Sequence, residues 1–144
     1  MRSAYCNCFN LTGSPVCGDK VTHMYRTYSN CKKLTGSPVC GPNVTDMRSA
    51  YSNCKNLASN GYFYSSKVSQ VSDCFRSRNN SKQLNLYVIN GSTTHKTVLY
   101  NNARSLVGAN ITWTKNRTCS YNTAYNIYIY PVDNVAAARA KNGD

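Results

Sequence analysis

The octapeptide LTGSPVCG stands at residues 11–18 of this chain and again, unchanged, at residues 34–41. The agreement extends outward, because residues 1–23 read MRSAYCNCFNLTGSPVCGDKVTH and residues 24–46 read MYRTYSNCKKLTGSPVCGPNVTD. A third unit opens at residue 47 with MRSAYSNCKNL and then diverges. A unit of 23 residues is too short to be a domain by itself. The period therefore indicates structural repeats that bury their apolar residues against one another.

The recurring apolar positions predict the core of this array. In a stack of similar units, each inward-facing residue lies on its counterpart in the next unit. We expect a short strand over residues 34–40, in which Pro38 is tolerated because the strand is brief. The predicted core residues, which occupy three repeat positions, are Cys8, Leu11, Val16, Cys31, Leu34, Val39, Cys54 and Leu57.

The pattern V-T-D-M-x-x-A-Y-x-N-C-x-x-L of residues 44–57 resembles the BspA-type leucine-rich repeat, and it is most similar to repeats of gut bacteria and their phages. The resemblance covers residues 1 to about 60 and departs from the family at Ser37 and Pro38, where an apolar strand residue is usual. It implies a short leucine-rich-repeat-like solenoid of the α/β or mainly-β class, with an irregular C-terminal cap of strands and helix. It also implies adhesion or recognition, the role linked to this family on bacterial and protozoan surfaces and in phage-encoded proteins.

The domain organisation follows from where the repeat fades. Residues 60–66, NGYFYSS, break the register, although Val68 and Val71 keep the spacing of Val44 and Met47. The expected segments are residues 1–66, a solenoid of units 1–23, 24–46 and about 47–69; residues 67–118, a degenerate repeat and cap; and residues 119–144, a strand and a short helix.

The second half carries weaker signals for individual elements. Leu84, Leu86 and Val88 alternate with polar residues, which predicts a half-buried strand. Ser92 or Thr93 is placed to cap a short helix that ends at Asn101 and turns Val98 and Leu99 inward. We expect a closing strand pair around Gly108, built from Leu106, Val107, Ile111 and Trp113.

The C-terminal residues predict one strand and one helix. Residues 124–132, AYNIYIYPV, alternate as a strand does, and Asp133 or Asn134 is suited to cap a helix over residues 135–141 with Gly143 beyond its end. Such a short, weakly apolar helix is marginal alone, and the sequence offers it nothing to pack on. We therefore expect the chain to belong to a longer polypeptide or to an assembly.

The charge balance favours anionic partners. Lys and Arg number 17 against 5 acidic residues, which gives a net charge of +12. Stacking aligns cations from shared or neighbouring repeat positions into a stripe beside a ladder of tyrosines, which suits glycans or nucleic-acid bases. Alternatively the cations only maintain solubility, and the tyrosines line the core. The candidate binding residues are Arg2, Arg26, Lys32, Arg48, Lys55, Tyr5, Tyr28 and Tyr51.

The eight cysteines permit three interpretations. Five of them occupy two repeat positions, which favours stacked, buried, reduced thiols. A disulfide framework is the second interpretation, as in small secreted domains. Metal binding is the third and least favoured, because Cys6-x-Cys8 has no further ligands at its repeat positions. We predict no metal and no cofactor.

Catalytic groups are sparse. His23 and His95 are the only histidines, and a basic ribonuclease that used both is a minor alternative. A Kazal-type inhibitor, echoed by PVCG and TYSNC, is another, although its cysteine spacing is not met. We expect a protein without enzymatic activity.

The favoured function is therefore a recognition or adhesion module of a phage virion (fibre or tail) or of a bacterial surface protein. Its expected ligand is a cell-surface glycan or anionic wall polymer, and its expected location is the virion or the extracellular surface. The alternatives are a structural assembly subunit of a filament or virion that contacts other protein subunits, and a basic nucleic-acid-binding protein. No stretch reaches the roughly 18 apolar residues of a membrane span.

Overall fold

The computed structural model describes residues 1–91, 106–107, 113–116 and 118–143. Its strands form one mixed sheet in the order β1-β2-β3-β6-β5-β4. The first four in this order pair in parallel, and the β4–β5 hairpin joins β6 antiparallel. The described elements are β1 (Val39–Cys40), β2 (Asn60–Phe63), β3 (Leu84–Ile89), β4 (Thr114–Lys115), β5 (Ser120–Asn122), β6 (Ile127–Val132) and α2 (Val135–Lys141).

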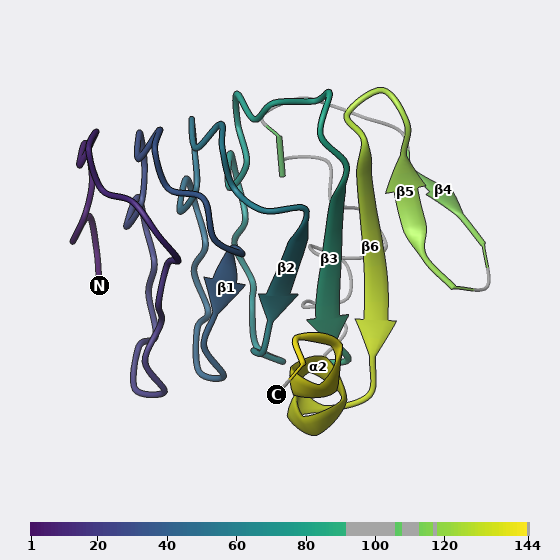
Figure 1. The fold of residues 1–144 in the computed structure, drawn as a ribbon. Helices are drawn as coiled ribbons and strands as arrows, with labels where there is room; N and C mark the ends of the chain where they lie inside the picture. The colour runs from purple at the N-terminus through teal and green to yellow at the C-terminus, as the bar shows by residue number, and fades with distance from the viewer. Residues whose placement is uncertain (92–105, 108–112, 117, 144) are drawn as a thin grey trace.

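Successive repeats stand side by side, and Figure 1 shows them as a row of loops that leads from the N-terminus to β6. Parallel bridges join His23 to Asp46 and Asp46 to Gln70, and these residues end the first three units. The third unit is thus one residue longer than the first two. The first unit spans residues 1–23, the second 24–46 and the third 47–70, and Val71 opens the fourth.

Each unit has two arms whose backbone hydrogen bonds point in opposite directions along the row. In the first arm, which holds the first seven positions of a unit, N–H groups donate to the next unit, as Ser3 does to the Tyr25 carbonyl at 2.8 Å. In the return arm, N–H groups donate to the previous unit, as Thr45 does to the Thr22 carbonyl at 2.7 Å. An inner unit is therefore hydrogen-bonded on both sides.

Two sharp corners shape the first arm of every unit. They lie at the third and seventh positions, and every residue there has a positive φ between 53° and 63°. Asparagine tolerates this left-handed conformation better than most residues, which accounts for the recurring Asn before Cys. The corner residues are Ser3, Arg26, Ser49 and Asp73 at the third position, and Asn7, Asn30, Asn53 and Ser77 at the seventh.

Aromatic rings form a column through the core. The ring centroids of Tyr5 and Tyr28 lie 5.2 Å apart, those of Tyr28 and Tyr51 5.5 Å, and those of Tyr51 and Phe75 5.8 Å. The rings are nearly parallel, and their spacing is set by the distance between neighbouring units. The column ties the first four units into one core.

The tyrosine hydroxyls of this column make hydrogen bonds to backbone groups that a neighbouring strand would otherwise bind. Tyr51 accepts from the Val39 N–H at 3.0 Å and donates to the Val39 carbonyl at 2.5 Å. Tyr28 makes the same two bonds with Val16, at 2.9 and 2.8 Å. Because the Tyr51 hydroxyl occupies the backbone groups of Val39, they are not available to the first unit, and among the described strands β1 pairs only with β2. Of the strand expected over residues 34–40, only β1, Val39–Cys40, is formed.

The pattern changes at the fourth unit, where Phe75 takes the tyrosine position. A phenyl ring has no hydroxyl, and the matching backbone group, the Tyr62 N–H, donates instead to the Pro38 carbonyl at 2.9 Å. Residues 60–63 therefore form β2 directly on β1. The expected break in register at residues 60–66 follows this strand: Cys40 pairs with Phe63, 23 residues later, whereas Asp46 pairs with Gln70, 24 residues later.

The predicted core residues are buried to different degrees. Cys31, Leu34, Cys54 and Leu57 are buried, whereas Cys8, Leu11 and Val39 are half-buried. Val16 is 63% exposed, against the expectation, and its counterpart Val39 packs against a second apolar cluster that contains Tyr62 and not against the main core. The largest fully buried side chains also include Met24, Met47, Phe63 and Phe75.

The C-terminal helix has the predicted bounds, the strand expected over residues 124–132 begins only at Ile127, and the packing of the helix differs from the expectation. Strand β6 spans Ile127–Val132, and α2 spans Val135–Lys141, with the Asn134 Oδ1 atom accepting from the Ala137 N–H at 2.9 Å. The helix lies at one end of the sheet strands in Figure 1 and is not without a partner. It joins an apolar cluster made of Tyr62, Tyr64, Ile89, Val132 and Ala138.

Other expectations for the second half have mixed outcomes. The alternating segment from Leu84 forms β3, as predicted. The helix expected up to Asn101 lies outside the described residues, as do Gly108 and Ile111. Leu106 and Val107 are buried in a turn rather than in a strand. Within the described parts of the chain, no helix has the length and apolar character that crossing a membrane requires.

Candidate functional site

A polar groove crosses the corners of the second, third and fourth units. It has a volume of about 510 Å³ and contains two arginines, one tyrosine and otherwise only serine and asparagine. None of its lining residues is acidic. We call it the polar groove; its residues are Tyr25, Arg26, Ser29, Asn30, Ser49, Ser52, Asn53, Arg76 and Ser77.

The floor of the polar groove is held by an asparagine ladder. The Asn30 Nδ2 donates to the Asn7 Oδ1 at 2.7 Å, and the Asn53 Nδ2 donates to the Asn30 Oδ1 at 2.9 Å. All three residues sit at left-handed corners, so their side chains leave the backbone in the same direction. Amide and hydroxyl groups therefore repeat along the groove at the spacing of the units.

Two guanidinium groups supply the charge of the polar groove. Arg26 makes no hydrogen bond or ion pair through its side chain with the described residues and is exposed. Arg76 approaches Asp73 at 3.9 Å between Nη1 and Oδ2, and the two side chains are 64% and 34% exposed. Such a long surface pair contributes little. Both guanidinium groups therefore remain available for carboxylate, sulfate or phosphate, which the planar guanidinium binds in a bidentate manner.

Arg48, another predicted cation, serves the fold instead. Its Nη2 lies 2.8 Å from the Asp46 Oδ2, and its guanidinium stacks over the Tyr25 ring at 5.0 Å. Burial alone would raise the pKa of Asp46, but the hydrogen bonds from the Arg48 side chain and backbone outweigh it and lower that pKa. The Arg48 side chain is therefore occupied by contacts that link the second and third units.

The remaining predicted cations do not enter the polar groove. Lys32 sits over the Phe9 ring at 5.9 Å, and Arg2 is exposed on the first unit. Lys55 lines a separate small cavity beside Arg78 and Lys82. The structure thus divides the expected stripe and brings only Arg26 into the groove.

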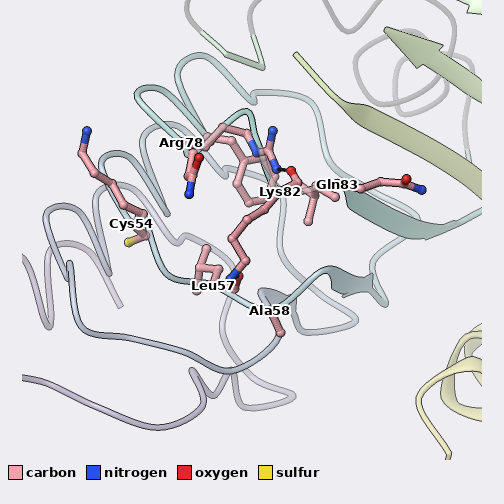
Figure 2. A pocket seen from close by; sticks show the side chains of 10 residues that line it. Cys54, Leu57, Ala58, Arg78, Lys82 and Gln83 are labelled. Carbon is pink, nitrogen blue, oxygen red and sulfur yellow. Dashed lines mark hydrogen bonds between the residues drawn. The ribbon is translucent and has the colours of Figure 1, made fainter. Parts of the chain in front are cut away.

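The residues that line the small cavity, shown in Figure 2, hold neighbouring parts of the fold together and do not form a ligand site. Its volume of about 20 Å³ holds roughly one water. Burial lowers the pKa of Arg78 to about 10, and its guanidinium donates to the carbonyls of Tyr125, at 2.5 Å, and Lys82. The Lys82 Nζ donates to the Leu57 carbonyl at 3.2 Å. These bonds link the fourth unit to the third unit and to the turn before β6.

The predicted tyrosines separate by burial. Tyr5 is 38% exposed, whereas Tyr28 and Tyr51 are buried and hydrogen-bonded to backbone groups. Tyr28 and Tyr51 therefore cannot contact a ligand, which corrects their place among the binding residues. Tyr25, three residues before Tyr28, reaches the polar groove instead.

Sequence reasoning missed Arg76 and the groove asparagines. Arg76 shares its repeat position with Ser29 and Ser52 only when the extra residue of the third unit is counted. The asparagines were visible in the repeat, but their shared direction comes from the left-handed backbone. The signal that could have identified these groove residues is the recurrence of polar residues at the corners of the repeat.

The cysteines are free thiols, five of them buried. Cys31 donates to the Tyr5 carbonyl at 3.1 Å and Cys54 to the Tyr28 carbonyl at 2.9 Å. Burial raises the pKa of Cys54 to about 12, so this thiol is held as a hydrogen-bond donor. Among the residues that the structure describes, no three potential ligands gather as a metal site would require. His95 lies outside them, and the His23 Nδ1 shares a hydrogen bond with the Thr22 hydroxyl, at 2.9 Å.

Comparison of the chain with family models, with curated proteins and with solved structures finds no match in any of the three.

Proposed function

We propose that this chain is a non-enzymatic recognition module, and that it binds an anionic polymer of a cell surface in the polar groove. The observation that carries the proposal is the pair Arg26 and Arg76 in a groove whose other linings are hydroxyls, amides and one phenol ring. Guanidinium groups recognise acidic substituents, while serine and asparagine exchange hydrogen bonds with sugar hydroxyls.

The direction of the groove supports a polymeric ligand. Its lining residues come from three successive units, and the asparagine ladder runs along the row. A chain of sugars or of phosphate-linked groups laid along the row meets similar donors at each unit. We further propose that the fold is a short leucine-rich-repeat-like solenoid and that it acts on a virion or a cell surface.

A nucleic-acid ligand is the second candidate, and the net charge of +12 favours it. The contribution of counterion release makes such binding strongly dependent on salt. Hydrogen bonds to sugar hydroxyls are much less sensitive to salt.

The test is retention of the protein on an immobilised phosphorylated wall polymer, a neutral polysaccharide and double-stranded DNA, at low salt and at roughly 0.5 M, where the Debye length falls severalfold. We expect retention on the wall polymer to survive salt. Replacing Arg26 and Arg76 by alanine should weaken it about tenfold or more, because each charged hydrogen bond contributes about 1.5–3 kcal/mol.

The matched control removes the same charge elsewhere. Lys20 and Lys33 are exposed and lie outside the polar groove, so their double alanine variant should retain binding. Equal losses in both double variants would show that the attraction depends only on net charge. Preference for DNA with complete loss in salt would replace the proposal by the second candidate.

A further inference from the structure

The two guanidinium groups of the polar groove come from units that are not neighbours. Arg26 belongs to the second unit and Arg76 to the fourth. The third unit lies between them, and the residues with which it lines the groove, Ser49, Ser52 and Asn53, carry no charge. Cationic and neutral units therefore alternate along the groove.

The separation of the two cations is close to twice the separation of neighbouring units. Arg26 and Ser29 are the ends of one tight turn, because the Ser29 N–H donates to the Arg26 carbonyl at 3.2 Å. Arg76 shares the repeat position of Ser29, so it lies two units along the row from that turn. Hydrogen-bonded neighbouring strands lie about 4.8 Å apart, so the two guanidinium groups are attached to backbone positions about 10 Å apart.

The middle of the polar groove presents a hydrogen-bond acceptor. In the asparagine ladder, each Nδ2 atom donates to the Oδ1 atom of the preceding unit, at 2.7 Å from Asn30 and at 2.9 Å from Asn53. The ladder ends at Asn53, because the fourth unit has Ser77 at this position. None of the described residues donates to the Asn53 Oδ1 atom. This oxygen therefore accepts a donor from a ligand, and it repels a carboxylate.

The one cation that the third unit holds nearby does not change this pattern. Arg48 is paired with the Asp46 carboxylate at 2.8 Å, and its guanidinium stacks on the Tyr25 ring. The charge of Arg48 is thus balanced within the protein, and Arg48 is not among the groove lining. The order along the groove is cation, acceptor, cation.

A ligand that matches this order carries an anionic group, then a hydrogen-bond donor, then a second anionic group, with about 10 Å between the two anions. Each sugar of an extended polysaccharide advances the chain by about the separation of two neighbouring strands. One sugar therefore lies on each unit. The order is met when a carboxylate occurs on every second sugar and the sugar between offers N–H or O–H donors.

We propose that the polymer of the polar groove is an acidic polysaccharide in which a uronic acid alternates with a neutral, N-acetylated sugar. The guanidinium groups of Arg26 and Arg76 bind successive carboxylates, and the Asn53 Oδ1 atom accepts from the sugar between them. A carboxylate on that middle sugar would leave water to meet an acceptor without a cation, which is unfavourable. This ligand assignment rests on the proposed function, because it concerns the same groove.

The experiment is calorimetric titration of the full chain with three oligosaccharides of equal length, at roughly 0.15 M salt. A hyaluronan fragment has a uronic acid at every second sugar, a polygalacturonate fragment has one at every sugar, and a chitin fragment is neutral. Attraction by net charge alone ranks the polygalacturonate fragment first, because the chain carries +12. We expect the hyaluronan fragment to bind about tenfold more tightly than either of the others.

The variant Ser49→Arg places another guanidinium in the middle of the groove. Ser49 and Arg26 share a repeat position, and both have a φ of 54°, so the backbone there accepts arginine. The variant should gain about tenfold in affinity for the polygalacturonate fragment, because the middle carboxylate acquires a charged partner. It should not gain for the hyaluronan fragment. A gain of affinity cannot come from loss of the fold.

The control is Thr123→Arg, which adds the same charge at an exposed turn before β6 and outside the groove. It should keep the preference of the parent chain. Equal or tighter binding of the polygalacturonate fragment by the parent overturns the ligand assignment, and so does a preference that Ser49→Arg does not shift.

Failure of the ligand assignment is distinguishable from failure of the proposed function. A chain that is retained on the phosphorylated wall polymer but binds none of the three fragments overturns the assignment and leaves the proposed function in place. A chain that binds neither the wall polymer nor any fragment overturns both.

Discussion

At the scale of single residues, a tyrosine hydroxyl takes the place of a neighbouring strand. Tyr51 satisfies both the N–H and the carbonyl of Val39, and its own burial raises the pKa of its phenol well above the usual value. Removing the hydroxyl leaves two backbone groups without a partner in a site that water does not easily reach. An unsatisfied buried group costs about 1–3 kcal/mol.

We therefore expect Tyr51→Phe to lower the free energy of unfolding by about 1–3 kcal/mol, measured by urea denaturation. Tyr5→Phe is the matched control, because Tyr5 occupies the same column and its hydroxyl bonds to none of the described residues. It should leave the unfolding free energy within about 0.5 kcal/mol of the parent. Equal effects of the two substitutions would contradict the role given to the hydroxyl.

The Asp46–Arg48 pair makes stability depend on acid. The folded pKa of Asp46 lies below its ordinary value of 3.8, because the Arg48 hydrogen bonds outweigh burial. A carboxylate with a lowered pKa stabilises the fold above the unfolded value and loses that contribution as pH falls through the folded pKa. The contribution is thus complete near neutral pH and declines below about pH 4.

Asp46→Asn should therefore lower stability at neutral pH and flatten the acid limb of a curve of melting temperature against pH. Asp19→Asn is the control, since Asp19 is exposed and forms no ion pair with the residues that the structure describes. If the acid limb of the curve is unchanged in Asp46→Asn, the acid sensitivity of the protein comes from other groups.

At the scale of elements, the separation of the units is set where backbones touch. A Cβ atom added at Gly36 would lie 2.3 Å from the Ser14 Cα and 2.2 Å from the Ser14 Oγ. The main chain of Ser14 cannot move aside without parting the first two units. At Gly18, by contrast, an added Cβ meets only the Val21 Cγ2, at 4.0 Å.

Gly36→Ala should therefore destabilise the chain by about 1–3 kcal/mol, the usual cost of overpacking, and Gly18→Ala should be close to neutral. The measurement is urea denaturation, with hydrogen exchange of the first unit as a local readout. Faster exchange confined to the first unit in Gly36→Ala is the specific sign of parted units. A neutral Gly36→Ala would contradict the close approach.

Helix α2 depends on the sheet for its stability, because seven residues are too few to be stable alone. Ala138 is its buried residue, whereas Ala136 is exposed. Ala138→Glu should release the helix and speed tryptic cleavage at Arg139, while Ala136→Glu should not. Equal cleavage of both variants would show that the helix does not rest on the cluster around Tyr62.

At the scale of the whole molecule, the repeat period was readable from the sequence and the consequences of one extra residue were not. Cys31, Leu34, Cys54 and Leu57 are buried as their recurrence predicted, because recurrence and burial have the same cause. Val16 recurs as Val39 does, but Val39 packs against the apolar cluster around Tyr62 whereas Val16 is exposed. Position in the row decides its exposure, and a repeat pattern carries no information about position.

The candidate site was only partly predictable. Arg26 was found because it lies beside a recurring cation position, whereas Arg76 depends on a shift of one residue in the third unit. Tyr28 and Tyr51 recur just as a binding ladder would, but sequence does not tell which side of an arm faces inward. The left-handed corners determine which side of an arm faces inward, and they are a property of the backbone geometry.

The burial of the thiols also gives the molecule a built-in reporter of how it opens. Cys6, Cys8 and Cys17 are half-buried and belong to the first unit, whereas all five other thiols are buried. Alkylation requires the thiolate and access to the sulfur, so a small alkylating reagent modifies the first unit first. Mass spectrometry of partly alkylated protein then separates fraying of that end from loss of the whole fold. In the sequence, these cysteines resemble a disulfide framework. In the folded protein, the order in which they are alkylated reports the order in which the units unfold.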